Sequence, residues 1–335
     1  MGSVREVAKE AGVSIGTVSR VINNHPQVSA AARQRVASAI KRSGYRPPRR
    51  GGPDTAAIAL VSTGGATTFT SPFTMAIFDG VAQGLQHHDY DLMVIDAQRA
   101  RRSNESIGDT LRRKGVVGTL IRTTEATRGV CEAICDEGVP SVVLAEQFDH
   151  PHVTCFGTTC ERACRSAVDH LLHLGHRQIA ITLNTVDDHD HAERYATFRA
   201  SLRAAGIEPE ERLTMRVPAS RDAGAVALRQ IMGMTDRPTA VFCTDPLAAV
   251  GLMHEALRIG VSIPRDLSVI GFDDSDSRFG VYPRMSSVCQ DAVALGREAF
   301  GLLERMIRGD DLRDARNVLQ GWFELHDSTA EPHTT

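Results

Sequence analysis

Residues 56–272 alternate short apolar runs with amphipathic stretches, and this pattern constrains the fold more than any other feature of the chain. Apolar runs between amphipathic stretches are typical of a parallel sheet that helices cover on both faces. In the first part of this region, strands are expected near residues 56–61, 92–95, 116–121 and 139–144, and helices near 73–88, 105–114 and 128–137. This part therefore predicts one doubly wound α/β lobe.

The same rhythm restarts after Phe156 and predicts a second lobe. Its expected strands lie near residues 178–183, 213–217, 240–243 and 267–272, and its expected helices near 161–174, 191–205, 222–232 and 247–259. A strand at 286–289, a helix at 292–308 and a strand at 318–325 remain, enough to return to the first lobe and finish in the second. Ligands of such sheets bind beyond the carboxyl ends of the strands, which for facing lobes means the cleft between them.

Length and composition agree with a chain of more than one domain. The 335 residues, 42% hydrophobic and 24% charged, fit two or three globular domains of about 100–200 residues each. No apolar run approaches the roughly 18 residues of a membrane span, and the N-terminus lacks the apolar core of a secretion signal. We therefore expect no membrane segment, a cytoplasmic location, and reduced thiols for the seven cysteines, which include no C-x-x-C pair.

Charge is distributed unevenly along the chain. The first 50 residues carry a net charge of +8, whereas the other 285 carry −11. A small basic head on a large acidic body is typical of a nucleic-acid-binding domain joined to another domain, because concentrated positive charge binds phosphate. The alternative is a solvated basic tail.

The basic head has the pattern of a helix-turn-helix. Ser3 and Glu6 have the spacing of a capping box, and Gly12 follows the first expected helix, where a left-handed turn costs little. Ser14 caps an expected second helix that ends near Ile22, and a third helix is expected from Ser29 to the residue before Gly44. The second helix of such a unit enters the major groove of DNA.

The head closely resembles the N-terminal signature of the lactose/galactose repressor (LacI/GalR) family. The residues that carry this resemblance are Val7-Ala8, Ala11-Gly12-Val13-Ser14, Thr17-Val18-Ser19-Arg20-Val21-Ile22-Asn23, Val28-Ser29 and Gly44-Tyr45-Arg46-Pro47. The body is similar to the same family at Leu174-Gly175-His176-Arg177, Ile263-Pro264, Gly271-Phe272-Asp273-Asp274 and Gln290-Asp291. The resemblance implies an N-terminal all-α helix-turn-helix head plus an α/β body of two doubly wound parallel-sheet lobes, similar to periplasmic binding proteins.

The resemblance also implies which head residues contact DNA. Base-reading positions are expected at Ile15, Gly16 and Arg20, and contacts that mainly position the phosphates at Ser3, Thr17, Ser19, Asn23 and Ser29. A guanidinium can bind guanine O6 and N7 together, so Arg20 is the principal specificity residue in this interpretation. The alternative is that Arg20 contacts phosphate only.

The connector departs from the family pattern. Family members usually carry a short hinge helix with a leucine that inserts into the minor groove, whereas the prolines and glycines between Pro47 and Pro53 oppose a helix. We expect Arg49 and Arg50 to contact the DNA backbone or minor groove from an extended segment. A flexible linker without DNA contacts is the alternative.

In the body, the resemblance implies an effector cleft. Arg194 and Asp273 are the expected effector-binding residues, with Phe73, Asp190 and Thr244 as further candidates. A guanidinium and a carboxylate that face each other across a cleft can hold vicinal hydroxyls, which favours a sugar. The alternatives are structural ion pairs for Arg194 and Asp273, and core burial for Phe73.

These observations predict the following organisation. The expected domains are a helix-turn-helix domain at residues 1–46, an atypical short linker at 47–54, and an effector-binding and dimerisation domain at 55–335. Within the last, lobe 1 is expected at about 55–157 plus 290–316, and lobe 2 at about 158–289 plus 317–330.

The function expected is that of a sequence-specific DNA-binding regulator, a repressor. Two copies are expected to bind a near-palindromic double-stranded operator under control of a small-molecule effector, a sugar. The alternative is a solute-binding receptor of the periplasmic-binding fold without a DNA role. No cofactor, metal site or catalytic residue is expected: Cys160 with Cys164, and His170, His173 and His176, do not complete a four-ligand zinc pattern.

Overall fold

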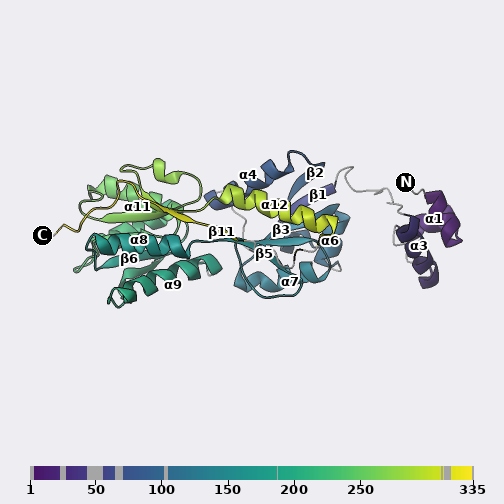
Figure 1. Cartoon of the computed structure of the whole chain (residues 1–335), viewed down its shortest axis with the longest axis horizontal. Helices are drawn as coiled ribbons and strands as arrows, with labels where there is room; N and C mark the ends of the chain where they lie inside the picture. Colours follow the sequence, from purple (N-terminus) through teal and green to yellow (C-terminus); the bar gives the residue numbers. More distant parts are fainter. Residues whose placement is uncertain are drawn as a thin grey trace. The chain divides into compact units, whose positions relative to one another are not determined.

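The computed structural model describes residues 4–22, 28–43, 56–64, 71–101, 105–186, 188–310, 312 and 318–333. The chain divides into two compact units, Met1–Asp54 and Thr55–Thr335. Each unit has a hydrophobic core of its own. Figure 1 labels helices and strands of both units.

The first unit consists of short helices around a small core. Its helices are α1 (Val4–Ala11), α2 (Ile15–Ile22) and α3 (Ala30–Ser43). Val7, Val18 and Val36, one from each helix, are completely buried. Gly12 lies between α1 and α2 with a φ of 62°, a left-handed conformation that favours glycine. The described part of this unit thus has the expected helix-turn-helix arrangement.

The second unit begins with a first lobe built on a six-stranded sheet in the order β11-β5-β4-β3-β1-β2. The strands are β1 (Ala56–Ser62), β2 (Tyr90–Asp96), β3 (Val116–Arg122), β4 (Ser141–Leu144), β5 (Thr154–Thr159) and β11 (Val318–Gln320). All neighbouring strands pair in parallel. The helices of this lobe are α4 (Pro72–Leu85), α5 (Ala97–Ala100), α6 (Ile107–Arg113), α7 (Arg128–Asp136) and α12 (Ala292–Arg308).

The second lobe has a six-stranded sheet in the order β12-β10-β9-β8-β6-β7. Its strands are β6 (Ile179–Leu183), β7 (Thr214–Arg216), β8 (Ala240–Cys243), β9 (Ser268–Asp273), β10 (Ser286–Cys289) and β12 (Trp322–Glu324). Among these described strands, β12 pairs antiparallel with β10, and the other neighbours pair in parallel. The helices are α8 (Glu161–His173), α9 (His189–Ala204), α10 (Arg221–Met232) and α11 (Pro246–Ile259).

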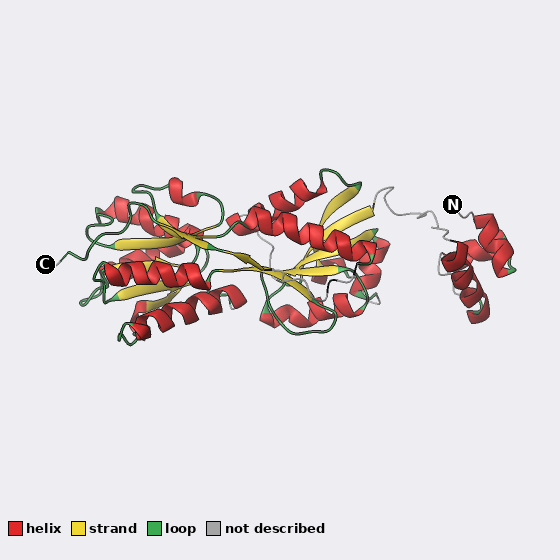
Figure 2. Ribbon diagram, viewed as in Figure 1, coloured by secondary structure: helices red, strands yellow, loops and turns green. Residues whose placement is uncertain are grey.

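Helices cover both faces of each sheet, because successive strand residues point to opposite faces. In β1, Ile58 and Leu60 pack with α4 and α12, whereas Ala57 and Val61 pack with α6 and α7. The second lobe has the same alternation, with α10 and α11 on one face and α8 and α9 on the other. Figure 2 shows the strands of each sheet running between these layers of helices.

The structure corrects the expectation of one strand at residues 318–325 that lies wholly in the second lobe. Gly321 interrupts it, so that β11 pairs with β5 in the first sheet and β12 pairs with β10 in the second. A Cβ at position 321 would lie 2.5 Å from Sγ of Cys160 and 2.9 Å from the carbonyl oxygen of Cys289. Gly321 therefore packs against two other segments, the start of α8 at Cys160 and the end of β10 at Cys289. The space between them is too small for a side chain at position 321.

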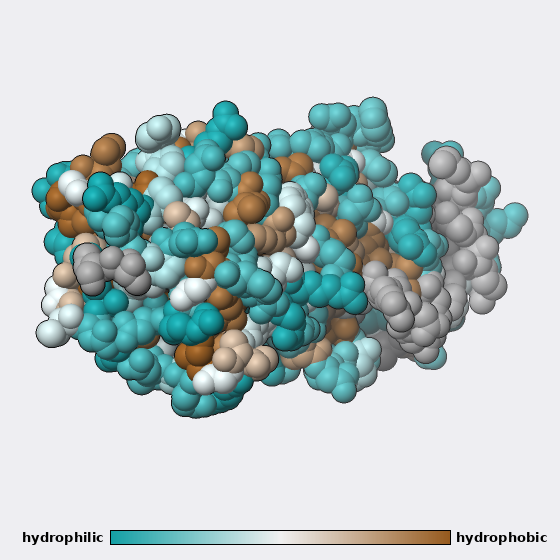
Figure 3. All heavy atoms as spheres, turned by 60° about the vertical axis from the view of Figure 1, so that its left-hand side comes forward, coloured by the Kyte–Doolittle hydropathy of each residue, from teal (hydrophilic) through white to brown (hydrophobic). Residues whose placement is uncertain are grey.

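The molecular surface is largely hydrophilic on the face drawn in Figure 3, with apolar side chains in separate groups. Among the described helices there is none long and apolar enough to cross a membrane. All seven cysteines are free, as expected.

Candidate functional site

The exposed face of α2 carries the side chains expected to read bases. Val18 is completely buried and fixes the helix on its unit, while Ile15 is 48% exposed and Gly16 and Arg20 are also exposed. Because Gly16 has no side chain beyond Cα, Ile15 and Arg20 are the groups at these positions that can reach a base edge. The helix begins at a cap in which Oγ of Ser14 accepts a hydrogen bond from the Thr17 amide over 3.0 Å.

The expected phosphate-contact residues lie partly in the described chain. Oγ of Thr17 lies 2.9 Å from Oγ of Ser14, and Oγ of Ser29 accepts from the Ala32 amide at the start of α3. Ser19 is half-buried on α2. The other expected contacts, Ser3, Asn23, Arg49 and Arg50, fall outside the described residues, as does the expected linker at 47–54.

A cavity of about 390 Å³ lies between the two lobes of the second unit. Its walls come from the carboxyl ends of parallel strands, where the cleft was expected: Arg122 ends β3, Asp245 follows β8, and Asp274 follows β9. Phe73, Asp190 and Arg194, expected from the sequence, all line it. The volume lies within the range of small-molecule sites, about 300–1,000 Å³.

Arg194 of α9 is the best-fixed cation of this cavity. Its Nη1 donates to the Thr244 carbonyl oxygen over 2.9 Å, and its guanidinium carbon lies 3.6 Å from the centre of the Phe272 ring. Its Nη2 lies 3.7 Å from a carboxylate oxygen of Asp190, one helical turn earlier. With the residue only 5% exposed, the guanidinium is held in one orientation before any ligand enters.

The first lobe contributes a second guanidinium and an aromatic ring. Arg122 donates from Nη1 to the Leu144 carbonyl oxygen over 3.1 Å, and its guanidinium lies 5.1 Å from the centre of the Phe73 ring. Phe73 lies in the first turn of α4, packs on the edge of the first-lobe core and also lines the cavity. Both lobes therefore offer charged donors to the same space.

The carboxyl groups that line the cavity with these cations differ in pKa. Burial raises the pKa of Asp274 to about 7, although a hydrogen bond from Gln290 and the charge of Arg194 act in the opposite direction. Burial also raises the pKa of Asp190, again against Arg194. For Asp188, burial is outweighed by hydrogen bonds from His191, which lower its pKa to about 2. The cavity thus combines an ionised carboxylate with carboxyl groups that titrate closer to neutrality.

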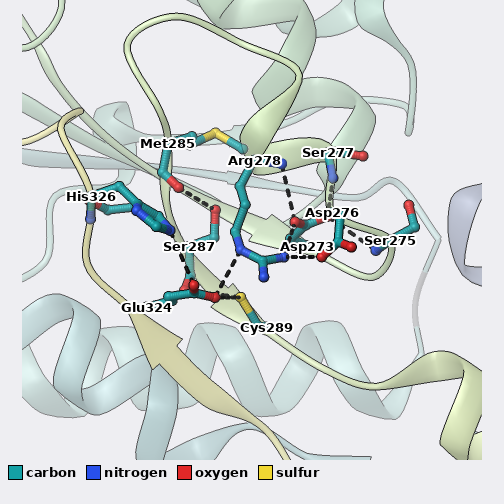
Figure 4. A network of polar contacts seen from close by, with 11 residues as sticks. Asp273, Ser275, Asp276, Ser277, Arg278, Met285, Ser287, Cys289, Glu324 and His326 are labelled. Atoms are coloured by element: carbon teal, nitrogen blue, oxygen red, sulfur yellow. Dashed lines mark hydrogen bonds and ion pairs between the residues drawn. The ribbon is translucent and has the colours of Figure 1, made fainter.

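The structure corrects the expectation for Asp273, whose carboxylate is engaged in a buried network (Figure 4). Its oxygens accept from the amides of Ser275, Ser277 and Arg278, and from Nη1 of Arg278 over 2.7 Å. Nε of Arg278 in turn lies 2.9 Å from Oε2 of Glu324 on β12. Asp273 is 1% exposed and does not line the cavity, whereas the carboxyl group of the adjacent Asp274 does.

Thr244 is corrected in the same way. Its side chain is completely buried and its Oγ1 donates to the Thr182 carbonyl oxygen over 2.8 Å. Its contribution to the site is its backbone carbonyl, which orients Arg194. Thr244 is therefore a positioning residue for the cavity and does not line it.

A second cavity, of about 510 Å³, shares Asp188 and His191 with the first. Arg128 and Glu146 line it from the first lobe, and Arg199 lines it from α9. Burial raises the pKa of Glu146, and within the described structure its Oε2 has no hydrogen-bond partner. The space between the lobes is consequently larger than the first cavity alone.

Several residues that line the first cavity are not among those expected from the sequence: Arg122, Asp188, His191, Asp274 and Gln290. Arg122 gave a usable signal, since it is a charged residue that ends an apolar strand. Asp274 did not, because the strand ends at Asp273 and strand alternation no longer predicts side-chain direction beyond it.

Comparisons with known proteins give a family match in each of the two units. Residues 3–48 match a family described as bacterial regulatory proteins, lacI family, and residues 168–326 match the periplasmic binding protein-like domain. The HTH-type transcriptional regulator CelR of Thermobifida fusca is 31% identical, and the match covers 96% of this chain and 96% of CelR. Catabolite control protein A of Priestia megaterium is 25% identical, and the match covers 98% of this chain and 99% of that protein. A solved CelR–cellobiose complex matches with a TM-score of 0.72 and 30% identity, covering 98% of this chain and all of that one.

A helix-turn-helix unit combined with a two-lobed body and a polar interlobe cavity defines a ligand-controlled DNA-binding regulator. A solute receptor without a DNA role does not account for the match at residues 3–48. The chain belongs to the lacI family of bacterial transcriptional regulators.

Proposed function

We propose that this protein represses transcription as a homodimer in the cytoplasm, and that a sugar bound between its lobes sets its affinity for a near-palindromic operator. The observation that carries this proposal is the polar cavity, where Arg122 of one lobe faces a space shared with Asp190, Arg194 and Asp274 of the other. A ligand that contacts both lobes favours one lobe arrangement over another, which is what a regulatory effector requires.

The chemistry of the cavity supports a polyhydroxylated ligand. Hydroxyl groups both donate and accept hydrogen bonds, so they can bridge a guanidinium and a carboxylate. Arg194 and Asp190 present such a pair over 3.7 Å, and Phe73 adds an aromatic surface against which the apolar face of a sugar ring can pack. The CelR–cellobiose complex supports the same class, since that regulator is similar over nearly the whole chain.

The space available favours a ligand larger than one sugar ring. The cavities of about 390 and 510 Å³ share Asp188 and His191, so they lie side by side. This arrangement suits a disaccharide at least as well as a monosaccharide, and both belong in a ligand screen.

The charge and the exposed side chains of the head support operator binding in which few side chains contact base edges. The first 50 residues have a net charge of +8, which suits phosphate contacts. On α2, Arg20 is the exposed side chain able to bind guanine bidentately, while Ile15 can make an apolar contact with a thymine methyl group. We assign phosphate-positioning contacts to Ser3, Thr17, Ser19, Asn23 and Ser29, and contacts with the DNA backbone or minor groove to Arg49 and Arg50.

A second copy is the proposed partner of the body, because paired half-sites require paired heads. Large apolar side chains are exposed on the second lobe, including Leu257 at 75% and Tyr282 at 88%. Single exposed apolar side chains are ordinary on a protein surface, so the need for paired heads, and not these residues, carries the dimer proposal. No catalytic step is part of this proposal, and the body acts as a sensor.

Two measurements test the proposal together. Genomic fragments selected by the untagged protein should share a near-palindromic sequence that competes against bulk DNA, and the protein should elute as a dimer. A thermal-shift screen with glucose, ribose, cellobiose and other mono- and disaccharides should raise the melting temperature with at least one sugar. Uniform binding to all fragments, or no response to any sugar, would refute the corresponding half of the proposal.

A further inference from the structure

A cluster of metal-ligating side chains lies in the first lobe, outside the cavities described above. Asp136, the last residue of α7, lies beside His150 and His152 of the loop that leads from β4 to β5. One carboxylate oxygen of Asp136 is 2.8 Å from Nδ1 of His152 and 3.7 Å from Nε2 of His150. These ligand atoms all lie within 4.8 Å of one another.

The separations match those around one small metal ion. Zinc binds imidazole nitrogen at about 2.0–2.1 Å and carboxylate oxygen at about 2.0–2.2 Å, which places neighbouring ligands of a tetrahedral ion roughly 3.3 Å apart. The Asp136 distances of 2.8 and 3.7 Å lie on either side of that value. Binding would therefore change each of these two Asp136 distances by only about half an ångström.

The ligand set selects a class of ion. Two imidazoles with one carboxylate suit zinc and its first-row transition-metal neighbours, whereas calcium and magnesium prefer oxygen ligands. Asp136 also ends a helix, and the negative end of the helix dipole favours a cation there. The side chains of Asp136, His150 and His152 are 52%, 19% and 62% exposed, so water can reach the ion and complete its coordination.

One hydrogen bond competes with the metal. The His152 amide donates to Nδ1 of His150 over 3.3 Å, which places the His150 proton on Nε2, the atom that faces Asp136. A metal on Nε2 requires that proton to move to Nδ1, at the expense of this long and exposed hydrogen bond. The exchange lowers the affinity but does not block the site, since water can replace the lost acceptor.

We propose that Asp136, His150 and His152 bind one divalent transition-metal ion of the zinc class. The ion ties the end of α7 to the loop between β4 and β5. That loop also carries Glu146, which lines the cavity of about 510 Å³. The proposal rests on side-chain geometry and is independent of the sugar and operator assignments.

The test uses full-length protein without a histidine tag, stripped with a chelator and then titrated with Zn²⁺ against a chromophoric indicator. Wild-type protein should bind one ion that His152→Ala and Asp136→Asn lose or bind at least about tenfold more weakly. His173→Ala, an exposed histidine on α8, should bind as wild type does. Equal Zn²⁺ stoichiometry and affinity in wild type and both ligand variants would overturn the proposal.

A second readout avoids dependence on the variants. Co²⁺ added to wild-type protein should give visible d–d absorption bands that Zn²⁺ abolishes and that excess Mg²⁺ or Ca²⁺ does not. Because the side chain of His152 is 62% exposed, His152→Ala should keep the metal-free melting temperature of the wild type. The absence of Co²⁺ bands in wild-type protein would contradict the proposal even if a variant failed to fold.

Discussion

The side-chain amide of Gln290 donates a hydrogen bond to Oδ1 of Asp274 over 2.6 Å, and both residues are buried. Asp274 lines the interlobe cavity, whereas Gln290 lies where the chain passes from β10 in the second lobe to α12 in the first. A ligand that contacts Asp274 therefore acts on a side chain that is hydrogen-bonded to Gln290. Gln290 belongs to one of the segments that connect the lobes and about which they can move.

Glu193 forms a comparable link at another connection between the lobes. Its carboxylate accepts from Oγ1 of Thr159 over 2.7 Å and from the Cys160 amide over 2.9 Å, at the passage from β5 to α8. Glu193 precedes Arg194 on α9, the helix that lines the cavity. The Asp273–Arg278–Glu324 network joins the loop after β9 to β12, just beyond the passage at Gly321. Polar contacts thus connect residues of the cavity wall, or their direct neighbours in the chain, to these passages.

Replacing Asp274 by asparagine should change how stability depends on pH. In the folded protein burial raises the pKa of Asp274 to about 7, and an unfolded aspartate titrates near 3.9. Its stabilising contribution is therefore complete below about pH 4 and is lost as the pH rises through about 7. Urea unfolding at a series of pH values should show wild type losing stability relative to Asp274→Asn across this window, by an amount on the order of a few kcal/mol.

The control for that experiment is Asp222→Asn, an exposed position at the start of α10. Its unfolding free energy should run parallel to the wild type between pH 4 and pH 8. Parallel curves for Asp274→Asn as well would mean that this carboxyl group is not desolvated as described.

Arg194→Lys should weaken sugar binding at least about tenfold, which corresponds to roughly 1.4 kcal/mol. Lysine keeps the positive charge but cannot span the Thr244 carbonyl, Asp190 and a ligand hydroxyl with one planar group. Calorimetric titration with the sugar that raises the melting temperature measures the effect. Arg203→Lys, on the exposed side of the same helix, is the matched control and should bind as wild type does. Equal affinities in the two variants would remove Arg194 from the site.

Gly321→Ala should destabilise the body by about 1–3 kcal/mol, the usual cost of an added methyl group in a filled space. The new Cβ would approach the Cys160 sulfur at 2.5 Å and the Cys289 carbonyl oxygen at 2.9 Å. Gly301→Ala is the matched control, because a Cβ there meets nothing within 4 Å. In the helical α12 this change should stabilise by about 0.5–1 kcal/mol. Urea unfolding that ranked the two variants in the opposite order would show that the passage at Gly321 is not crowded.

Arg20→Ala should reduce operator affinity by about 1–3 kcal/mol while reducing affinity for random DNA much less. The reason is that a bidentate contact with guanine exists only on the correct sequence. Lys9→Ala, another exposed cation of the head, should weaken binding to both DNAs by similar factors. Fluorescence anisotropy with both duplexes measures the ratio. An equal loss on the two DNAs for Arg20→Ala would reduce this residue to a phosphate contact.

The architecture could be predicted from the sequence because local signals agree with the final packing. Gly12 and Ser14 mark the turn and cap between α1 and α2, and apolar runs mark strands such as β1 and β8. β5 gave a weaker signal, since Thr154, Gly157 and Thr158 interrupt its apolar pattern. The division of residues 318–325 at Gly321 depends on contacts with Cys160 and Cys289, which are remote in sequence.

The site was only partly predictable for the same reason. Phe73, Asp190 and Arg194 line the cavity as expected, but the choice between Asp273 and Asp274 depends on how the chain turns after β9. Arg278 binds the Asp273 carboxylate, and Glu324 of β12, which is remote in sequence, binds Arg278. Asp136 and His150 likewise come together only in the folded chain, because β4 separates α7 from the loop that carries His150.

The central claim is that the sugar site and the operator site are coupled through one protein. Its most direct test is the operator dissociation constant of the full-length protein, measured by fluorescence anisotropy with and without a saturating concentration of the sugar identified by thermal shift. The account predicts a change of about 5–150-fold, with a reciprocal change in sugar affinity when operator is saturating. An operator affinity unchanged by a sugar that demonstrably binds would contradict it.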